Sequence, residues 1–218
     1  MLQEVKQMIR KEITLEWRQK FAFNGVLLYL VSTVFVCYLS FDRLIDVPTW
    51  NALFWIILMF ASINAVLKSF LQERDGRLLY YYTLVKPQSI INAKIVYNAL
   101  LMSALGIAGL VVFIGFMGNP VKNIGLFLVN MLLGVTGFSA VLSMVSAIAS
   151  KARNNFTLMA VLSFPLILPL LLVLIRVSSD AIHGATVVEA LPKLLVILLL
   201  SVITLVLSNV LFPYIWKE

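Results

Sequence analysis

Long apolar runs, separated by short polar stretches, dominate the hydrophobic pattern of the chain. Each run holds about 20 residues, which is the length an α-helix needs to cross a bilayer core of about 30 Å. None of the runs carries an ionisable side chain near its centre. An even number of spans places both termini on one side of the membrane. We predict an all-α, polytopic membrane protein with six transmembrane helices at about residues 23–41, 50–67, 95–117, 124–149, 156–175 and 194–212.

Residues 1–22 follow a different pattern from these runs. Apolar side chains recur at every fourth position, at Val5, Ile9, Ile13, Trp17 and Phe21. Cations lie on the other faces, which is typical of an amphipathic helix. We expect this helix to lie in the inner membrane interface with Trp17 at the level of the headgroups, or alternatively to pack against a cytoplasmic partner. The cations in question are Lys6, Arg10, Lys11, Arg18 and Lys20.

The distribution of lysine and arginine predicts the orientation, because short basic loops resist translocation. With the N-terminus inside, the inner segments hold 12 cations, against Arg43, Lys122, Arg176 and Lys193 at or near the outer ends. Both termini are therefore predicted to be cytoplasmic. The inner cations are Lys6, Arg10, Lys11, Arg18, Lys20, Arg74, Arg77, Lys86, Lys94, Lys151, Arg153 and Lys217.

Composition agrees with this assignment and narrows the function. Hydrophobic residues make up 61% of the 218 residues, the mean hydropathy is +1.00 and the formal net charge is +7. Because the cations flank spans and do not line one face among aromatics, anionic lipid headgroups explain the positive charge better than nucleic acid does. No nucleic-acid partner is expected.

Several kinds of chemistry find no support in the sequence. The absence of ionisable groups at mid-span argues against a self-sufficient ion-coupled carrier. Cys37 is the single cysteine and His183 the single histidine, which we place in an outer loop at 177–193, so no metal site is expected. Nucleophile, zinc and phosphate-loop motifs are missing, so any ATP used must be hydrolysed by another chain.

Polar side chains inside the spans are amides and hydroxyls, which in lipid most often form hydrogen bonds between helices. Ser139, Ser143 and Ala147 form a ridge of small residues in the fourth span, one turn after Gly134 and Gly137. This pattern predicts close packing of that span. The polar residues considered are Asn64, Asn98, Asn130, Thr136, Ser139, Ser143, Ser146, Ser163 and Ser201.

Pro165 and Pro169, four residues apart, interrupt the fifth span. Each removes a backbone donor and presses on the preceding turn, so we expect a kink or a break near the middle of this helix. The irregularity is either a packing kink or a hinge, or re-entrant break, that faces a translocation path.

The segment "FLQERDGRLLYYYTLVKP", residues 70–87, is the densest polar insert between two spans. Gly76 permits a left-handed turn and Pro87 marks the start or end of a helix. A helix of about ten residues fits between them, and its tyrosines indicate a position at the membrane surface. We therefore predict a short cytoplasmic helix between the second and third spans.

Taken together, these features resemble the cytochrome c maturation protein B family. The resemblance covers nearly the whole chain and is carried by Asp75-Gly76-Arg77-Leu78, Pro87 with Ala93-Lys94, the basic turn Lys151-Ala152-Arg153, and the Pro165/Pro169 pair. The sequence departs from the family at Leu79, where an acidic residue is common, and in the tyrosines that follow.

The resemblance implies one ABC-2-type permease domain over 1–218, with an interfacial helix at 1–22 and the membrane bundle at 23–213. It implies a bacterial cytoplasmic membrane protein that couples a separate ABC ATPase to haem delivery or to release of a haem-loaded chaperone. A haem-handling membrane subunit and an outer-face haem chaperone are the other expected partners. Because six spans are half of the twelve common in ABC exporters, we also expect either a homodimer or a pairing with another membrane subunit. ATP would be bound by the ATPase, so no cofactor is expected in this chain, and no pair of iron ligands is visible.

The same resemblance implies that the cytoplasmic helix docks in a groove of the ATPase. The charged turn would pair with charges there and the tyrosines would fill the groove, since aromatic residues are frequent hot spots. The residues assigned to this coupling role are Glu73, Arg74, Asp75, Gly76, Arg77, Leu78, Tyr80, Tyr81 and Tyr82.

Two alternatives remain open on the sequence alone. One is an exporter of the same architecture for another amphipathic substrate or a lipid. The other is a membrane scaffold that anchors partners without transport.

Overall fold

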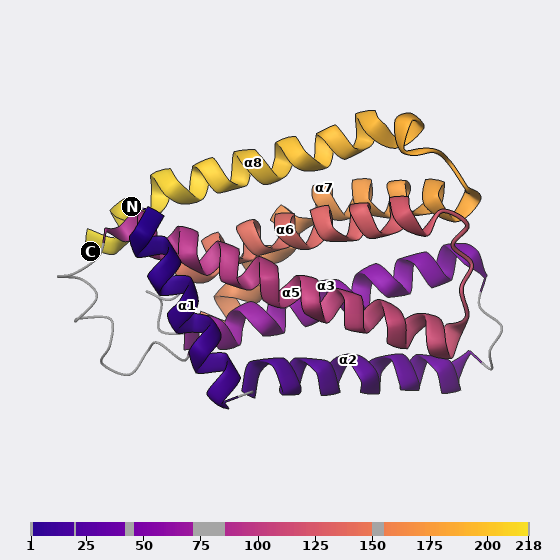
Figure 1. Ribbon diagram of the computed structural model, residues 1–218, viewed down its shortest axis with the longest axis horizontal. Helices are drawn as coiled ribbons and strands as arrows, with labels where there is room; N and C mark the ends of the chain where they lie inside the picture. The colour runs from indigo at the N-terminus through magenta and orange to yellow at the C-terminus, as the bar shows by residue number, and fades with distance from the viewer. Residues whose placement is uncertain (1, 20, 42–45, 72–85, 150–154, 218) are drawn as a thin grey trace.

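The computed structural model describes residues 2–19, 21–41, 46–71, 86–149 and 155–217, and the elements in these ranges are α-helices (Figure 1). Stretches long and apolar enough to cross a membrane occur in six of them, which confirms the predicted polytopic all-α class. The helices are α1 (Leu2–Gln19), α2 (Phe21–Ser40), α3 (Val47–Leu71), α5 (Pro87–Met117), α6 (Ile124–Ala149), α7 (Asn155–His183) and α8 (Val187–Lys217).

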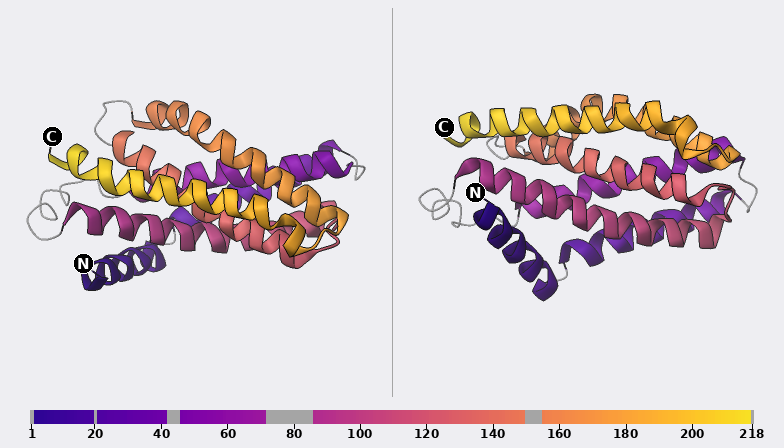
Figure 2. Two further views of the ribbon diagram at one scale, coloured as in Figure 1. Left: turned by 90° about the horizontal axis from the view of Figure 1, so that it is seen from above. Right: turned by 45° about the horizontal axis from the view of Figure 1, so that its top comes forward.

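The six long helices run side by side along the bundle, and both chain ends lie at the same end of it (Figures 1 and 2). We call this the terminal end, and the opposite one the far end. The turns from α5 to α6 and from α7 to α8 lie at the far end. Helix α1 crosses the terminal end obliquely, beside α5.

Helix α6 is the centre of the bundle and contacts α3, α5, α7 and α8. Its side chains are buried on every face from Val141 to Ala147. By contrast, α8 packs on one side only, against α5, α6 and α7, and the rest of its apolar surface is exposed in the isolated chain. In a bilayer that surface faces lipid or another membrane helix.

The third span begins earlier than the apolar run predicts, at Pro87 and not at Ile95. Pro87 occupies the first turn, where its missing N–H costs nothing. The predicted span left out residues 87–94 because Lys94 interrupts the apolar run. In the structure, the carboxylate of Glu12 lies 3.5 Å from the Lys94 ammonium and offsets its charge.

The predicted outer loop at 177–193 is wrong, because α7 continues to His183 and α8 starts at Val187. Gly184 ends α7 with a φ of 92°, which favours glycine. Thr186 and Glu189 cap α8 reciprocally: the Thr186 N–H donates to Glu189 Oε2, and the Glu189 N–H donates to Thr186 Oγ1. Asp180 of α7 and Lys193 of α8 form an ion pair of 2.6 Å. Because each charge has a partner, both residues lie within helices and not in a loop.

The backbone break predicted at Pro165 and Pro169 does not form, because α7 remains helical through both residues. Both prolines lie at exposed positions of the isolated chain. The hinge role of the two prolines stays a prediction.

Candidate functional site

The predicted coupling residues, from Glu73 to Tyr82, lie outside the described residues. The structure nevertheless fixes where their segment leaves and re-enters the bundle, because α3 ends at Leu71 and α5 begins at Pro87. Both points lie at the terminal end (Figure 1). Any force on this segment therefore reaches the bundle through α3 and through the first turns of α5.

The first turns of α5 carry a set of polar contacts that we call the α5 polar belt. Its members on α5 are Ser89, Asn92, Lys94, Ile95 through its carbonyl, and Asn98. These groups contact three other helices, and all of them lie in the first 12 of the 31 residues of α5, the part nearest the terminal end.

Helix α1 supplies the first set of partners for the polar belt. Ser89 Oγ donates to Glu4 Oε2 at 2.6 Å, and this hydrogen bond lowers the pKa of the Glu4 carboxyl below its ordinary value. Lys94 Nζ lies 3.5 Å from Glu12 Oε1, with side-chain exposures of 3% and 8%. A charged pair this deeply buried is unusual, since each ion loses most of its hydration.

The acidic residues of α1 explain this contact. Glu4, Met8, Glu12 and Glu16 recur at every fourth position and are buried or half-buried, so this row faces the bundle. Lys6, Arg10 and Arg18 form an exposed row on another side of the helix, and Ile13 is 45% exposed. Helix α1 therefore packs on α5 of its own chain, a partner that the apolar stripe alone did not indicate.

Helix α1 is also joined to the start of α2. Glu16 Oε1 accepts the backbone N–H of Phe23 at 2.7 Å. The first N–H groups of a helix have no partner within it, so this carboxylate caps the first turn of α2. Helix α1 thus connects the start of α2 to the start of α5.

Helices α6 and α8 supply the other partners. Asn98 Nδ2 donates to Ser143 Oγ at 2.9 Å, and Ser139 Oγ donates to the carbonyl of Ile95 at 2.6 Å. Asn92 and Asn209 exchange amide hydrogen bonds of 2.8 and 2.9 Å between α5 and α8. Displacing the start of α5 would therefore disturb α1, α6 and α8 together.

A second polar cluster lies toward the far end, between α3, α6 and α7. Ser178 Oγ accepts hydrogen bonds from Trp55 Nε1 at 2.7 Å and from Asn130 Nδ2 at 2.8 Å. Asn130 Nδ2 also donates to the Leu174 carbonyl, and Asn51 Nδ2 to that of Ile175. Because these groups are buried, the hydrogen bonds fix the register of the three helices.

The glycines predicted to serve helix packing lie at tight contacts of α6. A Cβ at Gly134 would come within 2.9 Å of Leu174 and of the Trp55 ring, and one at Gly137 within 2.7 Å of Leu170 and of Ser201 Oγ. Ser139 and Ser143, from the same predicted ridge, face α5 and not α7. The ridge therefore separates into two contacts on opposite neighbours.

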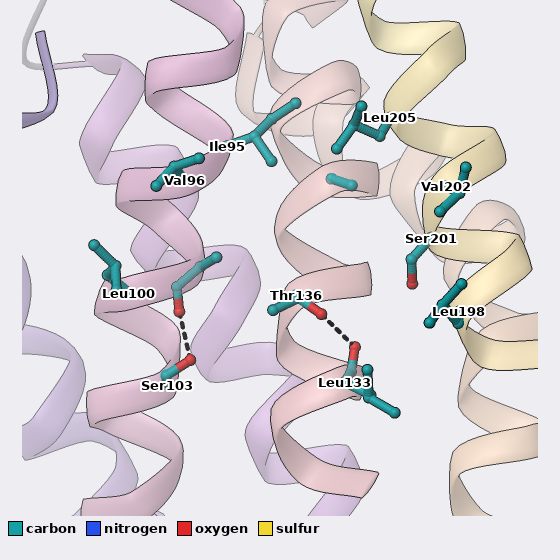
Figure 3. Close-up of a pocket in the computed structure, with 12 residues that line it drawn as sticks. Ile95, Val96, Leu100, Ser103, Leu133, Thr136, Leu198, Ser201, Val202 and Leu205 are labelled. Atoms are coloured by element: carbon teal, nitrogen blue, oxygen red, sulfur yellow. Dashed lines mark hydrogen bonds between the residues drawn. The ribbon is translucent and has the colours of Figure 1, made fainter. Parts of the chain in front are cut away.

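A groove of about 400 Å³ opens between α5, α6 and α8 (Figure 3). Its walls are aliphatic apart from Ser103, Thr136 and Ser201, each of which donates to a carbonyl of its own helix. The surface of the groove is therefore apolar and suits a hydrocarbon or the flat face of an amphipathic molecule.

Groups able to hold a metal ion are absent from the part of the chain that the structure describes. His183 lies at the exposed end of α7, where its Nδ1 is 2.7 Å from the Ser179 carbonyl. None of the residues that line the groove has an imidazole, thiolate or thioether that could ligate iron.

The sequence reasoning missed the Glu12–Lys94 pair and the Asn92–Asn209 pair. Glu4, Glu12 and Glu16 lie eight and four residues apart on one helix face, which was a signal for the first pair, because a row of carboxylates favours a cation opposite it. For the second pair no signal existed, since Asn92 and Asn209 are 117 residues apart.

Comparison with known protein families matches the chain to the family described as CcmB protein, over residues 3–214. A search of curated proteins found no match. The matched range includes the polar belt, its partners on α1, α6 and α8, and the segment between α3 and α5.

Proposed function

The chain belongs to the CcmB protein family, and on this premise we propose that it passes the force of nucleotide-driven closure from a separate ATPase to the bundle through α5. Membership makes it the membrane subunit of a haem-export ABC system for cytochrome c maturation, which works with an ABC ATPase and other maturation components. The catalytic step belongs to the ATPase.

The observation that carries the proposal is the position of the α5 polar belt. The belt follows directly after the segment that carries Asp75 and Gly76, and it joins α5 to α1, α6 and α8 by hydrogen bonds and an ion pair. A packed polar network of this kind has discrete arrangements and does not deform continuously, so it suits transmission of a movement.

The partners and the orientation follow from the same reasoning. The ATPase docks at the terminal end, which is cytoplasmic in a bacterial inner membrane, and binds the ATP. A haem-handling membrane subunit and an outer-face haem chaperone complete the complex. The exposed apolar surface of α8 suits a membrane neighbour, either a second copy of the chain or that subunit.

The coupling role is tested by Asp75→Ala and Gly76→Pro in the complex purified with its ATPase. We expect the complex to assemble and its ATP hydrolysis to be lost, because docking survives through the rest of the surface while the turn no longer transmits closure. Lys122→Ala, an exposed charge removed at the far end, is the control and should hydrolyse ATP normally. Normal hydrolysis by both coupling variants would contradict the proposal and favour a scaffold.

The groove between α5, α6 and α8 favours a second candidate, export of another amphipathic molecule or a lipid. Its aliphatic walls with three hydroxyls accept an acyl chain as well as the edge of a porphyrin. Cells that lack the chain but attach haem covalently to c-type cytochromes at normal levels would support this candidate over haem delivery.

A further inference from the structure

The buried pair formed by Glu12 and Lys94 is one of several contacts that hold α1 on α5. Met8 of α1 packs against an apolar cluster around Ile90 and Ile91, and Ser89 also bonds Glu4. A buried ion pair is weak evidence for stability, because the lost hydration of two charges offsets their attraction. What such a pair does provide is a single allowed geometry, since any displacement leaves both charges poorly solvated.

Glu12 lies between two cations of different exposure. Lys11 Nζ approaches its Oε1 at 3.0 Å from the more exposed side, and Lys94 Nζ approaches the same oxygen at 3.5 Å from the buried side. Glu12 therefore ties the buried face of α5 to the more exposed side of α1. Lys94 lies about two turns after Pro87, where the segment that bears the predicted coupling residues enters the bundle.

The next turn of α5 continues the contact into the bundle. Ile95 accepts the hydrogen bond of Ser139, and Asn98 donates to Ser143. Lys94 therefore lies where the contacts of α5 with α1 meet those of α5 with α6. Figures 1 and 2 show that α1 is not part of the parallel bundle and crosses the terminal end of α5 at an oblique angle.

We propose that Glu12 and Lys94 are positioning residues for coupling, which hold α5 at one rotation and depth against α1 so that movement of the segment before Pro87 reaches α6. This inference rests on the proposed function and deepens it, because it adds α1 as a second element of transmission. Without the pair, the start of α5 can shift or rotate against α1, so that less of the movement before Pro87 reaches α6 through the bonds at Ile95 and Asn98.

The test uses Glu12→Gln and Lys94→Gln in the complex purified with its ATPase, and in cells that lack the native chain. Three quantities are measured: the amount of assembled complex, its rate of ATP hydrolysis, and covalent haem on c-type cytochromes. We expect assembly and hydrolysis to persist while covalent haem in the cells falls by about 5- to 150-fold, the usual range of a coupling free energy.

Two further variants separate positioning from simple stabilisation. The charge exchange Glu12→Lys with Lys94→Glu should recover more covalent haem than either single variant, because it restores the pair. Asp180→Asn is the matched control, since it breaks the shorter and more exposed pair with Lys193 at the far end and should leave all three quantities unchanged.

Loss of assembled complex in both single variants would overturn the inference, because the pair would then serve folding alone. Normal covalent haem in both would overturn it too, as would a charge exchange no better than the single variants. Failure of the proposed function looks different: cells without any copy of the chain would then keep normal covalent haem.

Discussion

Replacing Gly134 by alanine tests the packing between α6 and α7. The new Cβ would lie 2.8 and 2.9 Å from two methyl carbons of Leu174 and 2.9 Å from the edge of the Trp55 ring. The Trp55 ring is held by its hydrogen bond to Ser178, so it cannot rotate away freely. Overpacking a filled site costs about 1–3 kcal/mol.

The helix propensity of alanine works against this cost, because alanine is favoured over glycine by about 0.5–1 kcal/mol in a helix. Gly115→Ala on α5 isolates that gain, since a Cβ there meets nothing within 4 Å. The difference between the two variants is therefore the overpacking alone. For a chain of this size about 1–3 kcal/mol corresponds to a difference in Tm of about 2–12 °C.

The assay is thermal unfolding of the purified chain in one detergent, followed by tryptophan fluorescence. We expect Gly134→Ala to unfold at a lower temperature than Gly115→Ala, and Gly115→Ala to unfold no lower than the unchanged protein. Equal Tm values for the two variants would refute the close approach of α6 to α7 at Leu174.

Two further predictions concern hydrogen bonds made by side chains. The pKa of Glu4 is lowered chiefly by the bond from Ser89, so its contribution to α1 docking is present above the ordinary value of 4.5 and is lost as the pH falls through the lowered pKa. Ser89→Ala should raise the Glu4 pKa in an NMR titration, and an unchanged value would contradict the bond. Asn130→Ala should lower the free energy of unfolding by about 1–2 kcal/mol, because its amide joins α6 to α7 at two acceptors. Asn64→Ala, whose amide bonds only its own helix at Phe60, should change it much less in the same denaturant titration, and equal losses would rule out the interhelical bonds.

The number and order of the spans could be predicted because the bilayer sets their length. Runs of about 20 apolar residues are needed to cross it, and the chain interrupts them with charge at most of the turns. The ends of the spans could not be predicted as well. Lys94 and Asp180 lie within helices, where Glu12 and Lys193 pair with their charges. The length of an apolar run does not reveal such partners, which come from other helices.

The placement of α1 shows a similar limit. Its apolar stripe was visible in the sequence and indicated a membrane surface, whereas the contact with α5 depends on the acidic row beside that stripe. Two rows of residues lie on one helix, and the positions of Lys94 and Ser89 on α5 favour the acidic row as the one that faces the bundle. For Gly134 and Ser139 the sequence indicated close packing but not the neighbours, which are α7 and α5.

The most direct measurement of the central claim is covalent haem on c-type cytochromes in cells from which the chain has been deleted. The account predicts that the deletion abolishes covalent haem, that the unchanged chain restores it, and that Asp75→Ala restores little although its complex with the ATPase assembles. Normal covalent haem in the deletion strain would contradict a role in cytochrome c maturation, and full restoration by Asp75→Ala would contradict transmission through the segment that precedes α5.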